Sequence, residues 1–240
     1  MFCIRFFDTL ASPKLLTLGK TQINLALHSF IRNFATMNNQ KQPKTNWSEN
    51  VIVVDADFVD SVAFNLIVNF ERMIDRRISR ADLAQWVEYV ALDGGVRPDY
   101  QQTTDTRQQT HVVLIHDKGT RSMENFCPSD LEKEINAQAF ESTLGEFTFS
   151  VVNAEGLATK EDFFTDTLRL VASQKDVKRI MVIPDEHYYD NIRDALRNVD
   201  DDSKRITVFA MQPMPGGNFR QEILGYSLMQ ALGIHADEIK

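Results

Sequence analysis

The sequence has few of the features that mark membrane, fibrous or disulfide-rich proteins. Its 240 residues include two cysteines, ten glycines and seven prolines, with no repeat and no apolar run long enough to span a bilayer. Cys3 and Cys127 are too few for a disulfide framework and lack zinc-site spacing, so a reducing, cytoplasmic location is expected. Basic residues are outnumbered by acidic ones, and the resulting net charge of −8 disfavours tight nonspecific binding to nucleic acid. What is present is 43% hydrophobic residues, enough for one full-sized core.

The first 36 residues differ in composition from the rest of the chain. They carry four basic residues against one acidic residue, which leaves a net charge of −11 on the remaining 204 residues. They contain no continuous apolar stretch with a small-residue cleavage site, so a secretory signal is not expected. Met37 opens a polar stretch and is an alternative start of the chain. We therefore expect a poorly structured leader at 1–49 and a single α/β domain at 50–240.

From residue 51 onward, short β-branched runs alternate with longer amphipathic stretches. Five runs are almost continuously apolar, as strands covered on both faces are: Val51–Val54, His111–Ile115, Phe147–Val152, Arg179–Ile183 and Ile206–Ala210. The alternation predicts a three-layer α/β fold, in which a doubly wound, mainly parallel five-stranded sheet has helices on both faces. Functional groups are then expected at the carboxyl ends of the strands, near the switch in strand order.

Helices are predicted by amphipathic spacing and by capping signals. One apolar stripe runs from Val59 to Ile74. Further helices are expected directly after three capping-box patterns: Ser79–Asp82, Ser129–Glu132 and Thr159–Asp162. Two more helices are expected at Tyr188–Val199 and Phe219–Leu232. The segment Gln101–Gln109, rich in Gln and Thr, is expected to be a mobile loop.

Carboxylates gather at the edge of the sheet where function is expected. Asp55 and Asp57 follow the first strand, Asp185 follows the fourth, and Asp162 and Asp166 open the helix after the third. If the first and fourth strands are neighbours, Asp55 and Asp185 are close enough to repel, and a divalent cation would relieve that repulsion. The pattern predicts an Mg²⁺ or Mn²⁺ site with ligands among Asp55, Asp57, Asp162 and Asp185.

Several of these residues also have a purely structural interpretation. Asp162 is the natural partner of Thr159 in a capping box, and Asp166 is an ordinary solvated helix residue. His187 and His116 lie near strand ends, where histidine is more often structural than catalytic. For Asp162 the cap is the better interpretation.

Basic residues and glycines form two weaker signals. One dense basic group either contacts a phosphate backbone or complements the carboxyl end of a helix; it contains Arg72, Arg76, Arg77 and Arg80. Gly94–Gly95 and Gly216–Gly217 lack the sequence context of a phosphate loop. We interpret both glycine pairs as turns.

Four segments together resemble the PIN-like, NYN-type nuclease domain. They are Val51–Asp57, Lys160–Leu168, Ile180–Tyr188 and Lys204–Phe209. The resemblance implies metal-dependent cleavage of RNA by Asp55, Asp166 and Asp185, with water attacking the phosphate. The chain departs from the family where Ile183–Pro184 replaces Ser-Gly and His187 replaces an acid, which implies a site with reduced or lost activity.

Asp55-Ala-Asp57-Phe-Val59 also resembles the first motif of the haloacid-dehalogenase phosphatases. That resemblance implies a phosphohydrolase in which Asp55 is the nucleophile and Asp57 the acid/base. Lys160 and the pair Asp185 and Asp190 are similar to the later lysine and metal-binding motifs. The Ser or Thr that this family has at the end of the second strand is replaced by His116-Asp117, so this alternative ranks second.

A third alternative is a non-catalytic interaction or scaffold domain. Clustered acids without a cation only repel, so in such a domain the removal of Asp55 or Asp185 is expected to raise stability. A receiver domain is disfavoured, because Asn153 stands where its phospho-acceptor would be.

Overall fold

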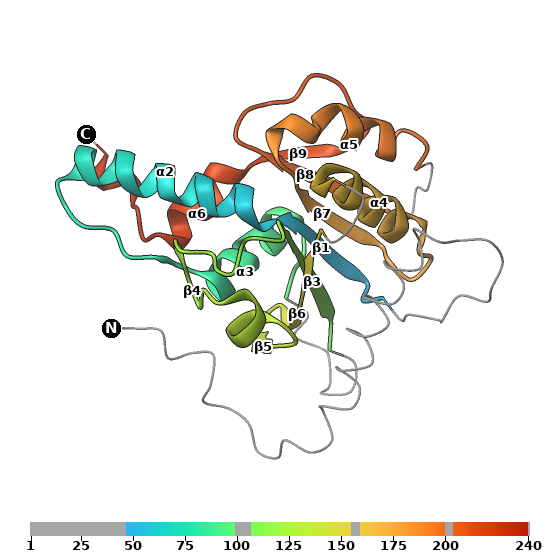
Figure 1. Ribbon diagram of the computed structural model, residues 1–240, viewed down its shortest axis with the longest axis horizontal. Helices are drawn as coiled ribbons and strands as arrows, with labels where there is room; N and C mark the ends of the chain where they lie inside the picture. The colour runs from blue at the N-terminus through green and yellow to red at the C-terminus, as the bar shows by residue number, and fades with distance from the viewer. Residues whose placement is uncertain (1–46, 99–106, 155–158, 200–203, 240) are drawn as a thin grey trace, which may run out of the picture.

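The computed structural model describes residues 47–98, 107–154, 159–199 and 204–239 (Figure 1). A seven-stranded sheet runs through the middle, in the order β5-β6-β3-β1-β7-β8-β9. The strands are β1 (Asn50–Asp55), β3 (Gln109–His116), β5 (Ala139–Ser142), β6 (Gly145–Asn153), β7 (Arg179–Ile183), β8 (Arg205–Ala210) and β9 (Arg220–Ile223). All neighbouring strands are parallel except β5, which pairs antiparallel with β6. A separate pair joins β2 (Ala81–Asp82) to β4 (Phe126–Cys127).

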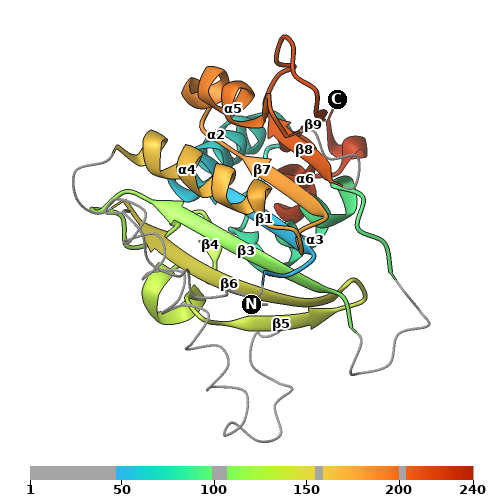
Figure 2. The ribbon, with the colours of Figure 1, turned by 90° about the vertical axis from the view of Figure 1, so that its right-hand side faces the viewer.

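Helices cover both faces of the sheet, so the three-layer α/β prediction is confirmed (Figures 1 and 2). One face carries α2 (Ala56–Ile74), α3 (Leu83–Asp93) and α6 (Leu224–Ala231), and the other carries α4 (Lys160–Ser173) and α5 (Tyr189–Leu196). Alternate residues of each strand feed two separate cores: Ile52 and Val54 pack on the α2 side, whereas Val51 and Val53 pack on the α4 side. Trp47, ahead of β1, belongs to the second core.

The order of the strands fixes where the functional edge lies. All five predicted strands are present, and the first and fourth of them, β1 and β7, are parallel neighbours as expected. The chain moves outward from β1 through β3 to β6 and then returns to the other side of β1 at β7, so the switch in strand order is at β1. The carboxyl end of β1 is therefore the position where this topology concentrates functional groups.

The prediction of a five-stranded, mainly parallel sheet was incomplete, because both edges carry an additional strand. The helix expected after Ser129 is only a short π-helix (Leu131–Ile135) capped by Asp130, and the chain then forms the antiparallel edge strand β5. The helix expected at Phe219–Leu232 begins only at Leu224, because Arg220–Ile223 pair with β8 as β9.

Two further helix expectations have different outcomes. The second helix is capped by Asp82, whose side chain accepts from the Gln85 N–H, and not by Ser79. The Thr159 cap is confirmed, because its hydroxyl accepts a bond from the Asp162 N–H. The predicted mobile loop at 101–109 lies largely outside the described residues, as does the leader up to residue 46.

Two expectations concern the surroundings of the protein. Across the described ranges, no helix is both long enough and apolar enough to cross a bilayer. Cys127, which the sequence predicts to stay reduced, is disulfide-bonded in the structure. The other cysteine of the chain, Cys3, lies outside the described residues.

Gly145, at the start of β6, provides a test of the hairpin that adds β5 to the sheet. Its φ is +117°, and a Cβ atom there would lie 2.1 Å from the Gln108 backbone oxygen. Gly145→Ala is therefore expected to lower the free energy of unfolding by about 1–3 kcal/mol in urea denaturation. Gly119→Ala is the matched control, because a Cβ atom at Gly119 meets nothing within 4 Å. Equal losses in the two variants would contradict this account.

Candidate functional site

Four polar side chains from three segments meet at the carboxyl end of β1. Asp55 is the last residue of β1 and caps α2, accepting a 3.0 Å bond from the Phe58 N–H. Asp57 lies in the first turn of α2, Asp117 follows β3, and Lys160 is the first residue of α4. Because parallel strands end at the same edge, residues more than 100 positions apart in the chain come together here.

Lys160 is the centre of this group. Its Nζ atom lies 3.0 Å from Asp55 Oδ1, 2.9 Å from Asp57 Oδ2 and 3.3 Å from Asp117 Oδ2. The Asp55 side chain is fully buried and the Lys160 side chain is 10% exposed, whereas the Asp117 side chain is 59% exposed. The ammonium is thus a largely buried counter-ion shared by two enclosed carboxylates and one surface carboxylate.

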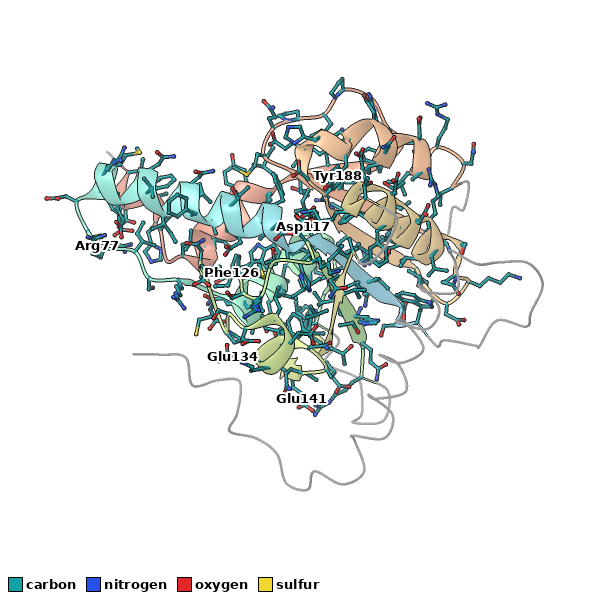
Figure 3. The ribbon with its side chains drawn as sticks, viewed as in Figure 1. Arg77, Asp117, Phe126, Glu134, Glu141 and Tyr188 are labelled. Carbon is teal, nitrogen blue, oxygen red and sulfur yellow. The ribbon has the colours of Figure 1, made fainter. Side chains whose placement is uncertain are left out.

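Asp57 also fixes the loop that follows β3. Its Oδ2 accepts a 2.8 Å bond from the Asp117 N–H, and its Oδ1 accepts a short bond from the Thr120 hydroxyl. Figure 3 shows Asp117 beside the junction of β1 and α2, with Tyr188 across from it on the α4 and α5 side. The site therefore ties together β1, the start of α2, the loop after β3 and the start of α4.

The proton affinities follow from burial and from these contacts. Burial raises the pKa of Asp55, and the nearby Lys160 charge only partly opposes that rise. Burial alone would also raise the pKa of Asp57, but bonds from Thr120, Lys160 and the Asp117 N–H lower it below its usual range. Burial disfavours the charged form of Lys160, yet Asp55 and Asp57 together raise its pKa well above the ordinary value. Lys160 is therefore a cation at neutral pH.

The other predicted site residues make separate contacts. Asp185, after β7, accepts from the His187 N–H at 2.9 Å and pairs with His187 Nδ1 at 2.7 Å, and this contact raises the pKa of His187. Asp166 is half exposed and pairs with Arg169 one turn later on α4. Asp162 is engaged with the Thr159 cap. Asp190 pairs with Arg193 on α5.

The donor set does not fit a divalent cation in this arrangement. Within the part of the chain that the structure describes, no group of three or more His, Cys, Asp or Glu side chains is arranged to hold a metal ion. Asp55 Oδ1 and Asp57 Oδ2 both accept hydrogen bonds from the Lys160 ammonium. An Mg²⁺ ion bound by both of these oxygens would require this ammonium to leave, so the cluster in this arrangement does not hold a metal ion.

Sequence reasoning missed part of this site. Thr120 carried no signal, because it lies four positions beyond the end of β3, where a loop residue can point anywhere. Lys160 was recognised only through the phosphatase resemblance. The sequence did contain an unspecific signal for Lys160 as a site residue, because it is a lysine at the start of a helix next to the predicted group of carboxylates.

The dense basic group lies away from this edge and is largely neutralised. Arg76 makes a two-nitrogen ion pair with Glu238, Arg77 pairs with Glu71, and Arg80 approaches Glu124. Figure 3 shows Arg77 at the far end of α2 from Asp117. These contacts favour the structural interpretation of the group over a phosphate-backbone contact.

Fold and site together define a doubly wound α/β domain with a lysine-bridged carboxylate cluster at its switch point. A family model matches residues 44–239, and the chain belongs to that family, a family of unknown function termed DUF6621. No curated protein matches the chain.

Proposed function

We propose that this chain is a non-catalytic α/β interaction domain, a form of the PIN-like, NYN-type architecture in which a lysine takes the place of the catalytic cation. The observation that carries the proposal is the position of Lys160 Nζ, within 3.3 Å of the carboxylates of Asp55, Asp57 and Asp117. An ammonium neutralises carboxylates but has no open coordination position for a water molecule or a phosphate oxygen. The cluster is thus suited to holding strand ends together.

Charge and access support the same conclusion. Three carboxylates surround one ammonium, so the site keeps a negative charge that repels a phosphodiester. Asp55 Oδ2 is buried and has no hydrogen-bond partner, so neither water nor a substrate reaches it in this arrangement. Asp166, which the nuclease resemblance assigns to catalysis, pairs with Arg169 instead.

A phosphohydrolase is the second candidate, because Lys160 contacts the two aspartates that the phosphatase resemblance assigns as nucleophile and acid/base. Asp55 would attack the phosphorus of a phosphate monoester as the bond to the alcohol oxygen breaks, Asp57 would have to carry the proton for that oxygen, and water would then cleave the aspartyl phosphate. The bonds that lower the pKa of Asp57 oppose this acid role. This candidate requires Asp55 Oδ2 to become exposed. The first proposal requires no such movement and is preferred.

The test combines melting temperatures with two hydrolysis assays. The wild-type protein, Asp55→Asn, Lys160→Ala and the matched control Asp166→Asn are melted with and without Mg²⁺ or Mn²⁺ at constant ionic strength. Each protein is also incubated with single-stranded RNA and with p-nitrophenyl phosphate. We expect no metal-specific shift and no hydrolysis in the wild type. Lys160→Ala should gain stability from Mn²⁺, because its carboxylates then lack a counter-ion.

The possible contrary outcomes point to different alternatives. RNA cleavage that needs Mg²⁺ and is lost in Asp55→Asn would overturn the proposal in favour of a nuclease. Release of phosphate from the aryl ester that is lost in Asp55→Asn and retained in Asp166→Asn would favour the phosphohydrolase.

A further inference from the structure

Arginines open three neighbouring strands at the opposite, amino-terminal edge of the sheet. Arg179 is the first residue of β7 and Arg205 the first of β8, and their Cα atoms are register partners. Arg220 opens β9 and is in register with Thr207, two residues beyond Arg205. Register partners and alternate residues in a parallel sheet point to one face, so the three arginines share the face that carries α3 and α6.

A fourth arginine reaches this cluster from the end of α3. Arg179 Nη1 donates a 2.9 Å bond to the Gly94 oxygen, which brings the turn after α3 against β7 (Figure 2). Gly95 allows the approach, because its φ is +87° and a Cβ atom there would lie 2.9 Å from Arg179 Nη1. Arg97, two residues later, donates to the backbone oxygens of Leu92 and Val96. We call Arg97, Arg179, Arg205 and Arg220 the arginine cluster.

The arginine cluster is not balanced by carboxylates. Within the described ranges no acidic side chain forms an ion pair with Arg97, Arg179 or Arg205, and Arg220 pairs with Glu222. Two other acids lie near the cluster: Glu49, near Arg179, pairs with Lys178, and Asp93 lies near Arg97 and Arg220. The four guanidinium groups still outnumber the nearby carboxylates that are not paired with a lysine. The cluster therefore carries a net positive charge on a protein whose overall charge is −8.

Two details show that the described residues do not fully satisfy the arginine cluster. Like charges on register partners repel, and in the part of the chain that the structure describes no carboxylate forms an ion pair with Arg179 or Arg205. Burial lowers the pKa of Arg179, and the charges of Arg205 and Arg97 lower it further. In addition, Arg179 Nε is buried without a hydrogen-bond partner. An anion at this edge would remove the repulsion.

We propose that the arginine cluster binds the phosphate group of a small phosphorylated ligand. A phosphate monoester carries nearly two negative charges and three acceptor oxygens, and planar guanidinium groups bind such oxygens in pairs. Adjacent strands are about 4.8 Å apart, so the backbones that carry the three strand arginines span about 10 Å, a distance across which long arginine side chains can converge on one phosphate group. The negative charge on the rest of the chain disfavours a long polyanion. This site is independent of Lys160 and of the function proposed for it.

Calorimetric titration at constant ionic strength tests this proposal. The three ligands titrated are inorganic phosphate, a nucleoside 5′-monophosphate and the matching nucleoside. We expect saturable binding of at least one phosphate-bearing probe and none of the nucleoside, which separates a free phosphate from a phosphorylated metabolite as the source. Arg205→Gln, an exposed residue, should weaken binding about tenfold or more. Arg169→Gln is the matched control, because Arg169 is an exposed arginine on α4 paired with Asp166.

A second measurement separates binding from folding. Without phosphate, Arg205→Gln should melt at a higher temperature than the wild type, because one repulsive charge is gone, and phosphate should erase the difference. The proposal is overturned if neither phosphate probe binds, or if Arg169→Gln weakens binding as much as Arg205→Gln does. Tighter binding of a single-stranded RNA that depends on Arg205 would assign the cluster to a polynucleotide and also overturn it.

Discussion

Lys160→Met is expected to lower the free energy of unfolding by about 3–5 kcal/mol, the loss that follows when a buried ion pair is broken from one side. Methionine keeps the length and apolar stem of the side chain but removes the ammonium, so the buried Asp55 is left without a counter-ion. Asp117 adds little to this loss, because its side chain is 59% exposed. Urea denaturation at neutral pH measures the effect.

A double-mutant cycle distinguishes the lost ion pair from lost packing. Asp55→Asn alone should also destabilise the protein, because Lys160 keeps a buried charge with one partner fewer. This loss of stability is the opposite of the gain expected if Asp55 belonged to a cluster of acids without a counter-ion. Combining Asp55→Asn with Lys160→Met should cost clearly less than the sum of the single changes. Additive losses would contradict a coupled pair.

The interior of the sheet could be predicted from the sequence because burial constrains it most. Strands such as β1 and β7 are covered on both faces, so nearly every position is apolar and the run is visible without any partner. The edge strands β5 and β9 contain no fully buried residue, so their sequences carry no such run. Arg220–Ile223 form a strand only because β8 offers a free edge, which is a tertiary effect.

The candidate site could be predicted only as far as topology allows. The position of Asp55 follows from strand order, since any residue after the central strand lies at the switch point. The spacing of residues in the sequence does not fix the position of the charged end of a long, flexible side chain. The contacts of the Lys160 ammonium with Asp55 and Asp57 could therefore not be predicted from the sequence. The same applies to Asp185, whose side chain turns to the His187 N–H and ring.

His111 should make the stability of the protein depend on pH below neutrality. This residue of β3 is buried between Ser150, whose hydroxyl lies 2.8 Å from Nε2, and the ring of Trp47. Burial lowers the pKa of His111 to about 4 from an ordinary value of 6.5. Below pH 6.5 the unfolded chain binds a proton that the folded protein does not, so stability is present above that pH and is lost as the pH falls toward 4.

Between pH 7 and pH 5 the loss due to His111 should be about 2 kcal/mol, measured as the change in unfolding free energy at the two pH values. Carboxylates also take up protons near the lower pH, so the informative quantity is the difference from His111→Gln. Glutamine can still bond to the Ser150 hydroxyl but does not titrate, and its stability should fall less over the same interval. If the two proteins lose equal stability, the buried imidazole is not the titrating group, and the acid sensitivity arises instead from carboxylates such as Asp57, whose pKa is lowered in the folded state.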